Sequence, residues 1–479
     1  RLEQAGDMVS IAINYRKDEF MSKPEKSYRK RKIGDHVLQP ESLVMGYGFD
    51  PAMSEGSIKP PIFMTSTFAF KSARDGEALF RQLAGKREEG DPEEADLIYT
   101  RFNNPNMEVL EDRLTLYDAG DHALVFSSGM GAITTALLAC AGAGTTILHS
   151  SPLYGGTEVF VRTFMPDFGV TPFEMDAWAT EEQILAKARE AAKKGPLSVI
   201  FTESPANPTC ALVDIEACGR VADIIGEETG HRPIVMCDNT MMGPIGHVPL
   251  KHGADLALYS LTKYIGGHSD LVAGAAIGSD DVIKKIRRVR NYLGTTLDAH
   301  TCWLVTRSLE TVRLRMEKAF DNARTCAEFL RDHPKIGKIM YPAFLEEGDP
   351  QRKVYDEQCE AAGSTFSFDV KGGKEAAFRM LDNLQLIKLA VSLGGTESLM
   401  CHPGSTTHSG VDEEIRKRIG FTDGLIRFSV RVHSHTKPHR GNLPYVGPAL
   451  TQPPQVGLEA AADLEADLAQ ALDKLKPAA

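Results

Sequence analysis

The chain is organised around Ser260-Leu261-Thr262-Lys263-Tyr264-Ile265-Gly266-Gly267-His268-Ser269-Asp270, a segment that places one lysine among small and hydroxyl-bearing residues. Before it runs Ala254-Asp255-Leu256-Ala257-Leu258-Tyr259, whose apolar pattern is typical of a buried parallel strand. We therefore expect Lys263 at the end of a strand, where partial desolvation lowers the pKa of its amine. A neutral lysine amine can attack a carbonyl group, so the pattern predicts a chemically active lysine.

A competing interpretation of Lys263 stays open at this point. A lysine at a sheet edge can also extend its charge into solvent, which is the commoner role of an isolated lysine. If Lys263 is reactive, it could hold a carbonyl cofactor such as pyridoxal phosphate as a Schiff base, and the hydroxyl groups of Ser260 and Thr262 could bind the phosphate. The rest of the sequence has to decide between the two.

The composition is that of an ordinary globular protein, with 479 residues of which 42% are hydrophobic and 25% are charged. This length allows two or more domains. A net charge of -11 argues against a nucleic-acid or anionic-membrane surface, and no apolar run approaches the ~18 residues of a membrane helix. The eight cysteines show no CxxC pair, which argues against a zinc site or a disulfide framework and favours a reducing cytoplasm.

Strands and helices alternate along most of the chain, which predicts βαβ units on a mostly parallel sheet. The expected strands are residues 122–126, 146–149, 198–201, 233–237 and 425–430, and the expected helices are 107–116, 132–140, 215–225, 281–292 and 300–330. Asn106 is expected to cap the first of these helices, and residues 284–290 to form a solvated basic face. A final helix should bury one apolar face made of Leu464, Leu468, Leu472 and Leu475.

Two segments could bind a phosphate. Ser127-Ser128-Gly129-Met130-Gly131 lies between a strand and an alanine-rich helix, whose N-terminus offers backbone N–H groups and a favourable dipole, although a tight turn without a ligand fits equally well. Arg101 beside Tyr99 could also serve a phosphate or form a surface pair. Gly142-Ala143-Gly144 has the wrong order for a dinucleotide fingerprint, which disfavours a nicotinamide dehydrogenase.

Polar residues follow several of the predicted strands, and ligands of open α/β sheets collect at the carboxyl ends of strands. Asp238 would need a cationic partner if it is buried, and a protonated pyridine nitrogen would supply one; a helix cap is the alternative. Tyr154 could stack on a planar cofactor or pack in the core. Arg427, embedded in an apolar strand, needs an anion from an internal carboxylate or from a substrate.

Two further segments are expected to be loops. The charged residues 85–97 are predicted to be a solvated insertion. Residues 433–458 are rich in proline and glycine, and they contain three histidines that we interpret as solvated rather than metal-binding because cysteine and acidic ligands are absent nearby: His433, His435 and His439.

Together these motifs resemble the Cys/Met-metabolism family of pyridoxal-phosphate enzymes, from about Met45 to the C-terminus. The most specific parts are residues 260–270, 392–408 and 99–105. The resemblance implies an α/β fold of the aspartate-aminotransferase-like type (fold type I), with a mostly parallel sheet in a large domain and a smaller α+β C-terminal domain. From the second possible start at Met21 and the change of pattern near Thr311, we expect a leader at 1–20, an arm at 21–107, a large cofactor-binding domain at 108–311 and a C-terminal domain at 312–479. The resemblance implies that the arm contributes to the neighbouring subunit's site.

The resemblance also implies roles for individual residues. Lys263 would hold pyridoxal phosphate and shuttle protons, Asp238 would pair with the pyridine nitrogen, and Tyr154 would stack on the ring and act as a second acid–base group. The substrate carboxylate would be bound by Ser392 and Arg427. The other implied cofactor contacts are Gly129, Met130, Asn207, Ser260 and Thr262, with Tyr99 and Arg101 reaching across from a neighbouring subunit. No metal is implied.

The activity within this family depends on a few positions. Cystathionine-handling members tend to carry a glutamate where Val391 stands, and methionine γ-lyase-like members do not, although these often have a cysteine at the place of Gly156 and an aspartate at that of Asn291. We therefore expect γ-elimination from methionine or a related γ-substituted amino acid. The alternatives are γ-replacement, as in O-acylhomoserine sulfhydrylase or cystathionine γ-synthase, and γ-elimination from cystathionine or canavanine.

The expected partners are a small amino-acid substrate and further copies of the chain, as a dimer of active sites and a homotetramer, without nucleic acid or membrane. The expected location is the cytoplasm. Thr406, residues 431–433 and the loops 85–97 and 433–458 depart from the family pattern and could reshape the pocket. A catalytically idle member or a binding module for pyridoxal phosphate is the alternative class; the presence of Lys263, Asp238, Tyr154 and Arg427 together argues against it.

Overall fold

The structure is a computed structural model that describes residues 28–83, 86, 88, 89, 97–411, 413–430 and 460–475. The expected leader, the three histidines, residues 431–433 and the loop 433–458 lie outside the described residues, as does most of the loop 85–97. No described helix combines the length and the apolar character that crossing a membrane requires.

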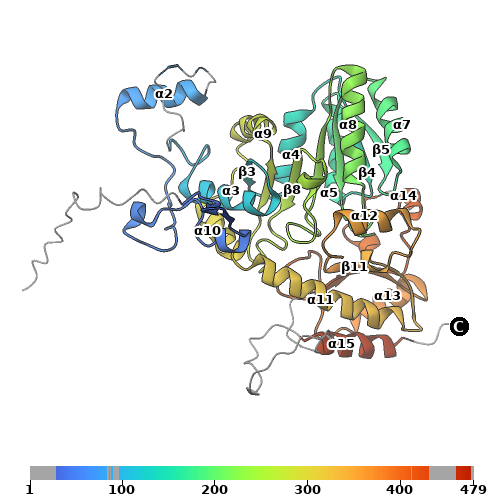
Figure 1. The fold of residues 1–479 in the computed structure, drawn as a ribbon. Coiled ribbons are helices and arrows are strands. Elements are labelled where there is room, and N and C mark those ends of the chain that lie inside the picture. The colour runs from blue at the N-terminus through green and yellow to red at the C-terminus, as the bar shows by residue number, and fades with distance from the viewer. Residues whose placement is uncertain are drawn as a thin grey trace, which may run out of the picture.

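The large domain is built on a seven-stranded sheet (Figure 1). Its strands lie in the order β3 (His122–Phe126), β9 (Gly274–Gly278), β8 (Leu256–Ser260), β7 (Ile234–Asp238), β6 (Leu197–Glu203), β4 (Thr146–Ser151) and β5 (Thr171–Asp176). The five strands from β8 to β5 are parallel, whereas β9 runs antiparallel to both of its neighbours. This confirms the expected mostly parallel sheet, with each predicted strand of this region present.

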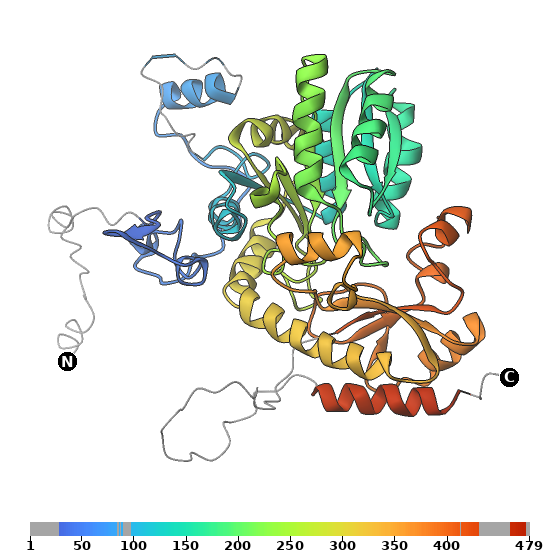
Figure 2. The same cartoon turned by 45° about the vertical axis from the view of Figure 1, so that its right-hand side comes forward.

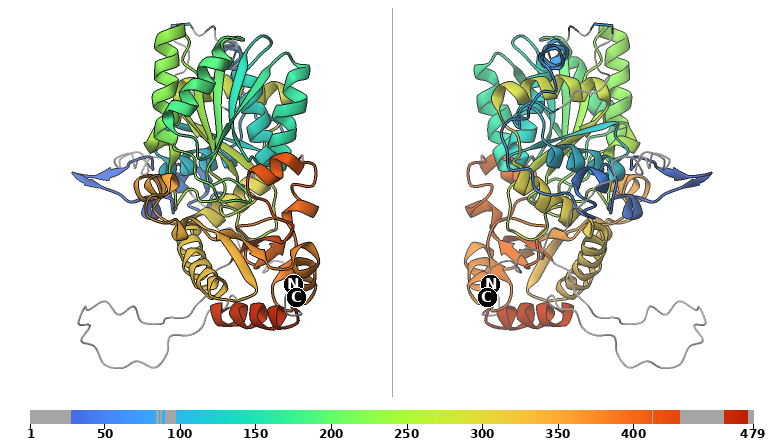
Figure 3. Two further views of the ribbon diagram at one scale, coloured as in Figure 1. Left: turned by 90° about the vertical axis from the view of Figure 1, so that its right-hand side faces the viewer. Right: turned by 90° about the vertical axis from the view of Figure 1, so that its left-hand side faces the viewer.

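Helices cover both faces of this sheet (Figures 1 and 3). Along β6 the side chains alternate, so that Val199 and Phe201 join the core under α4 (Gly129–Cys140) and α9 (Asp280–Leu293). Ile200 between them joins the core under α7 (Glu181–Ala192) and α8 (Ile215–Thr229). Burial on both faces explains why these strands are apolar throughout rather than at alternate positions.

The C-terminal part holds a second, five-stranded sheet (Figure 2). Its order is β10 (Ile336–Met340), β11 (Thr365–Val370), β14 (Leu425–Ser429), β13 (Leu399–Cys401) and β12 (Lys388–Leu389). The accompanying helices are α11 (Val312–Arg331), α12 (Pro350–Gln358), α13 (Gly373–Asp382), α14 (Glu413–Arg418) and α15 (Ala461–Asp473). The four leucines predicted as one apolar face, Leu464, Leu468, Leu472 and Leu475, are all buried there, which confirms that prediction.

The N-terminal segment lies to one side of the large sheet, and α2 stands apart from both sheets (Figures 1 and 2). Its elements are β1 (Lys32–Ile33), β2 (His36–Val37), α1 (Pro40–Leu43), a 3-10 turn (Pro51–Ser54), α2 (Ala73–Leu83) and α3 (Pro105–Asp118). The chain then continues into the large domain at β3.

Three local predictions need correction, one of them only in part. Asn104, not Asn106, caps α3, with its side chain accepting the N–H of Asn106 at 3.0 Å; Pro105 takes the first helical position, which it favours. The basic face expected at 284–290 is confirmed for Lys284, Lys285, Arg287 and Arg288, which are exposed. It is wrong for Arg290, which follows Ile283 and Ile286 on the inner face of α9, is buried and donates to Glu111 at 2.7 Å.

The third concerns the long helix expected at 300–330, which is divided into α10 (Ala299–Leu309) and α11. The Ser308 carbonyl at the break accepts the Arg315 guanidinium at 2.9 Å and the Thr311 hydroxyl at 3.2 Å. In a continuous helix, this carbonyl would instead accept the backbone N–H of the residue four positions later.

Candidate active site

Lys263 lies just beyond the end of β8, where the large and C-terminal domains meet. Its Nζ donates to the Ser392 hydroxyl at 2.9 Å, so the amine bridges the two domains. The loop carrying Ser392 packs tightly on the lysine: a Cβ on Gly394 would lie 2.5 Å from the Tyr264 nitrogen and 2.9 Å from the Lys263 carbonyl carbon. Ser392 itself has φ of 97°, a strained value for a residue with a side chain, of the kind that clusters at functional sites.

Asp238 ends β7, beside the lysine, and is only 7% exposed. Burial raises the pKa of its carboxyl, while hydrogen bonds from Thr240 and the charge of Lys263 act in the opposite direction. The Thr240 N–H and hydroxyl both donate to Asp238 Oδ1, at 3.0 and 2.6 Å. Asp238 therefore does not cap a helix; it is held in place as an acceptor close to a cation.

The residues expected to form a phosphate cradle lie together at the start of α4 and the end of β8. Helix α4 begins at Gly129, and Ser260 at the end of β8 packs directly against it, so that a Cβ on Gly129 would lie 2.8 Å from Ser260 Cβ. The first N–H groups of a helix have no partner within that helix, which suits an anion. The Ser260 N–H donates to Thr240 Oγ1 at 2.8 Å, which ties this cradle to Asp238, while the Thr262 hydroxyl is engaged with the Ala273 backbone.

Arg427 projects from β14 and is 3% exposed. One of its terminal nitrogens donates to Asn207 Oδ1 at 3.1 Å and the other to the Ser392 carbonyl at 2.8 Å. Neither acceptor carries a charge, and its Nε has no partner among the described residues. A buried guanidinium with an unused donor is suited to a carboxylate supplied from outside the chain.

Tyr154 is 41% exposed, so it is not a packed core residue. Its ring bends back over Gly156: a Cβ there would lie 2.8 Å from Tyr154 Cε1 and 3.3 Å from Met130 Sδ. Because Gly156 has no side chain, the Tyr154 ring can occupy this space, which a larger residue would fill.

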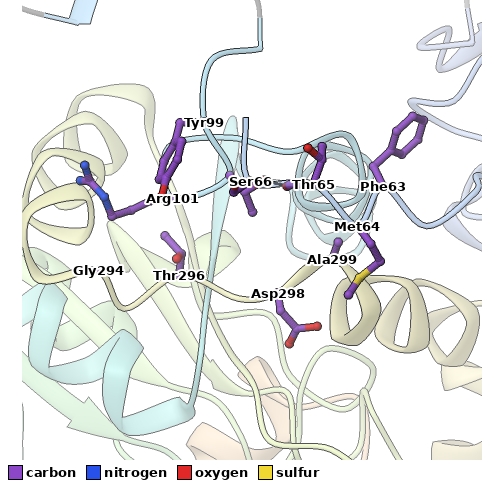
Figure 4. A pocket seen from close by; sticks show the side chains of 11 residues that line it. Phe63, Met64, Thr65, Ser66, Tyr99, Arg101, Gly294, Thr296, Asp298 and Ala299 are labelled. Carbon is purple, nitrogen blue, oxygen red and sulfur yellow. Dashed lines mark hydrogen bonds between the residues drawn. The ribbon is translucent and has the colours of Figure 1, made fainter. Parts of the chain in front are cut away.

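Tyr99 and Arg101 lie elsewhere in the chain. They line a hollow of about 510 Å³ whose lining includes none of the residues around Lys263 (Figure 4). Arg101 donates to the Asn291 carbonyl, and its guanidinium lies 4.4 Å from the Phe102 ring centre. Their expected role in a neighbouring subunit's site stays a prediction.

One residue was assigned no role from the sequence. Glu203, at the end of β6, is 4% exposed and accepts the backbone N–H groups of Tyr154 at 2.7 Å and Asn207 at 2.9 Å. Its place at a strand end was the available signal, but its partners could not be read from the local pattern.

The donor set fits pyridoxal phosphate. A lysine amine, a buried carboxylate and a glycine-lined helix N-terminus match the aldehyde, the pyridine nitrogen and the phosphate of that cofactor. Within the described part of the chain, no group of three or more His, Cys, Asp or Glu side chains could hold a metal ion.

The comparisons with known proteins agree with this geometry. A family model described as "Cys/Met metabolism PLP-dependent enzyme" matches residues 41–435. The chain is 36% identical over 422 residues to L-methionine gamma-lyase of Fusobacterium nucleatum, covering 88% of this chain and 94% of that protein. It is also 36% identical over 333 residues to cystathionine gamma-lyase of Mus musculus, covering 69% and 80%. The crystal structure of metB from Corynebacterium glutamicum superposes with a TM-score of 0.75 at 28% identity, covering 92% of this chain and 99% of that one.

Proposed function

The chain belongs to the Cys/Met-metabolism family of pyridoxal-phosphate-dependent enzymes, and from this premise we propose that it catalyses γ-elimination from methionine or a related γ-substituted amino acid. With methionine and water, the products are 2-oxobutanoate, ammonia and methanethiol. The observation that carries the choice of substrate is Val391, which precedes Ser392 and is 51% exposed beside the site. An apolar side chain there offers no charged partner to the distal ammonium group of cystathionine.

Pyridoxal phosphate, when bound, supplies an electron sink next to the substrate Cα. The residues of the chain itself bind the substrate and transfer its protons. Arg427 binds the substrate carboxylate through Nε and a terminal nitrogen, and so fixes the orientation of Cα. Lys263 Nζ removes the proton from Cα and, in a later step, one from Cβ.

The remaining roles concern charge and the leaving group. Asp238 would pair with the pyridine nitrogen of the bound cofactor and keep that nitrogen protonated. The Tyr154 hydroxyl delivers a proton to the departing γ-substituent. Gly129, Met130, Ser260 and Thr262 would hold the phosphate, and Asn207, whose side-chain oxygen accepts from Arg427, would contact the cofactor.

A second function is γ-replacement on an O-acylhomoserine with a sulfur nucleophile. It is supported by solved structures of cystathionine gamma synthase from Xanthomonas oryzae, to which the chain is 28% identical with a TM-score of 0.75. Elimination from cystathionine or canavanine would use the same catalytic residues with a different lining of the substrate pocket.

We further propose that the active site is completed in a dimer, within a homotetramer, because Tyr99 and Arg101 lie in a hollow that Lys263 of their own chain does not line. All eight cysteines are free thiols, which supports the proposed cytoplasmic location.

The test of substrate choice is a panel of methionine, cystathionine, canavanine, and O-acetylhomoserine with and without sulfide. We expect methionine to give 2-oxobutanoate and thiol, and Val391→Glu to raise kcat/KM for cystathionine relative to methionine by roughly tenfold, because the carboxylate can pair with the distal ammonium group. Amino-acid analysis separates replacement from elimination. Homocysteine formed from O-acetylhomoserine and sulfide, without oxoacid from methionine, would contradict the proposal.

The phosphate cradle leads to a separate prediction. Gly129→Ala should weaken binding of pyridoxal phosphate by at least about tenfold, since the new methyl group pushes the start of α4 away from Ser260 and from the anion. Titration of the cofactor-free variant, followed by visible absorbance, measures this. Gly142→Ala, just beyond the same helix, is the matched control because its Cβ would meet nothing within 4 Å. Equal affinity in the two variants would refute the assignment.

A further inference from the structure

The carboxyl group of Glu203 joins two loops that carry the site. Glu203 Oε2 accepts the N–H of Tyr154, which follows β4, and Oε1 accepts the N–H of Asn207, which follows β6. Its own N–H donates to the hydroxyl of Ser150 in β4 at 3.1 Å. Glu203 is only 4% exposed, so these hydrogen bonds are shielded from water.

Both loops end in groups that face the reaction. Tyr154 is the residue before α5 (Gly155–Val159), so fixing its N–H fixes where its ring enters the site. Asn207 is held at both ends, because its carbonyl accepts His408 Nε2 at 3.1 Å while its N–H is held by Glu203. Its side-chain oxygen is thereby aimed at Arg427. Small displacements of such groups are costly to catalysis.

Glu203 lies beside a second buried acid on the neighbouring strand, and its two oxygens each accept a backbone N–H. Glu203 and Asp238 are paired in register on β6 and β7. Burial, and then the negative charge of Asp238, raise the pKa of Glu203 well above its usual range. A neutral carboxylic acid still presents an acceptor on each oxygen, whereas an amide presents one acceptor and one donor group. Glutamine could therefore hold only one of the two N–H groups.

We propose that Glu203 is a positioning residue for the γ-elimination reaction, acting by holding the backbone of Tyr154 and Asn207 so that the tyrosine ring and the asparagine amide face the cofactor and Arg427. This proposal rests on the proposed function only in naming γ-elimination as the reaction. Cofactor binding itself reports the same geometry, whichever substrate the enzyme uses.

The test is a double-mutant cycle of Glu203→Gln with Tyr154→Phe. Glu203→Gln should lower kcat by roughly 10- to 100-fold with a smaller change in KM. The loss should be severalfold smaller in the Tyr154→Phe background, where the tyrosine hydroxyl is gone and only the positioning of Asn207 remains to be lost. The visible circular dichroism of bound cofactor should weaken at unchanged cofactor content. This readout stands even if the substrate panel rejects γ-elimination.

Asp255→Asn is the matched control, because Asp255 Oδ2 also accepts a backbone N–H on this sheet, that of Val235 at 2.8 Å, but at the opposite end of the strands. It should leave the circular dichroism band unchanged. If Glu203→Gln fails to fold, Glu203→Asp takes its place, since the shorter chain cannot reach both N–H groups. Equal kcat losses in both Tyr154 backgrounds, with an unaltered band, would show that Glu203 has only a structural role.

Discussion

Lys263→Ala is expected to lower kcat by at least ~10³-fold, because it removes both the amine that holds the cofactor and the base that moves protons at Cα and Cβ. The loss should appear in kcat rather than in KM, since Arg427 still binds the substrate carboxylate. Initial rates of 2-oxoacid release measure it. The variant should still bind pyridoxal phosphate through the α4 cradle, but without a covalent link to the chain.

An exposed lysine provides the comparison. Lys285→Ala, on the outer face of α9, removes the same functional group far from the site and should leave kcat unchanged. A small amine added to the Lys263→Ala variant should restore part of the rate, because it can replace the missing base. Activity near the wild-type level without added amine would mean that another residue is the base.

Arg427→Lys is expected to raise KM by roughly 100-fold, equivalent to about 3 kcal/mol, with a smaller effect on kcat. The reason is geometric: lysine keeps the charge but cannot donate to Asn207, Ser392 and a carboxylate from one planar group. Steady-state kinetics with methionine give the measurement.

Arg290→Lys is the control for this change, because Arg290 is as deeply buried but pairs with Glu111 under α9. It should lower thermal stability without altering KM. The cofactor absorbance of the Arg427→Lys variant should match that of wild type. A normal KM in this variant would remove Arg427 from the substrate site.

Much of the site could be predicted from the sequence where burial alone decides the chemistry. A lysine after an apolar strand and an arginine inside one have few structural explanations, and the structure places both where the two domains meet. The strand, turn and helix around Gly129 could also be predicted, because a local sequence pattern specifies them.

The rest depends on distances that no local pattern contains. Glu203 and Tyr154 are 49 residues apart in sequence, and only the parallel pairing of β4 with β6 brings their loops together. At the break before α11, the Ser308 carbonyl accepts the side chain of Arg315, which follows it by seven residues. The cap at Asn104 differs, because Pro105 offered a signal that could have been used.

A covalent link between Lys263 and pyridoxal phosphate underlies every catalytic role proposed above. Borohydride treatment of the cofactor-loaded enzyme makes such a link irreversible, and peptide mapping by mass spectrometry then locates it. We predict one modified peptide, spanning residues 260–270, with the added mass on Lys263. Recovery of that peptide unmodified, with the cofactor on another lysine or on none, would contradict the account.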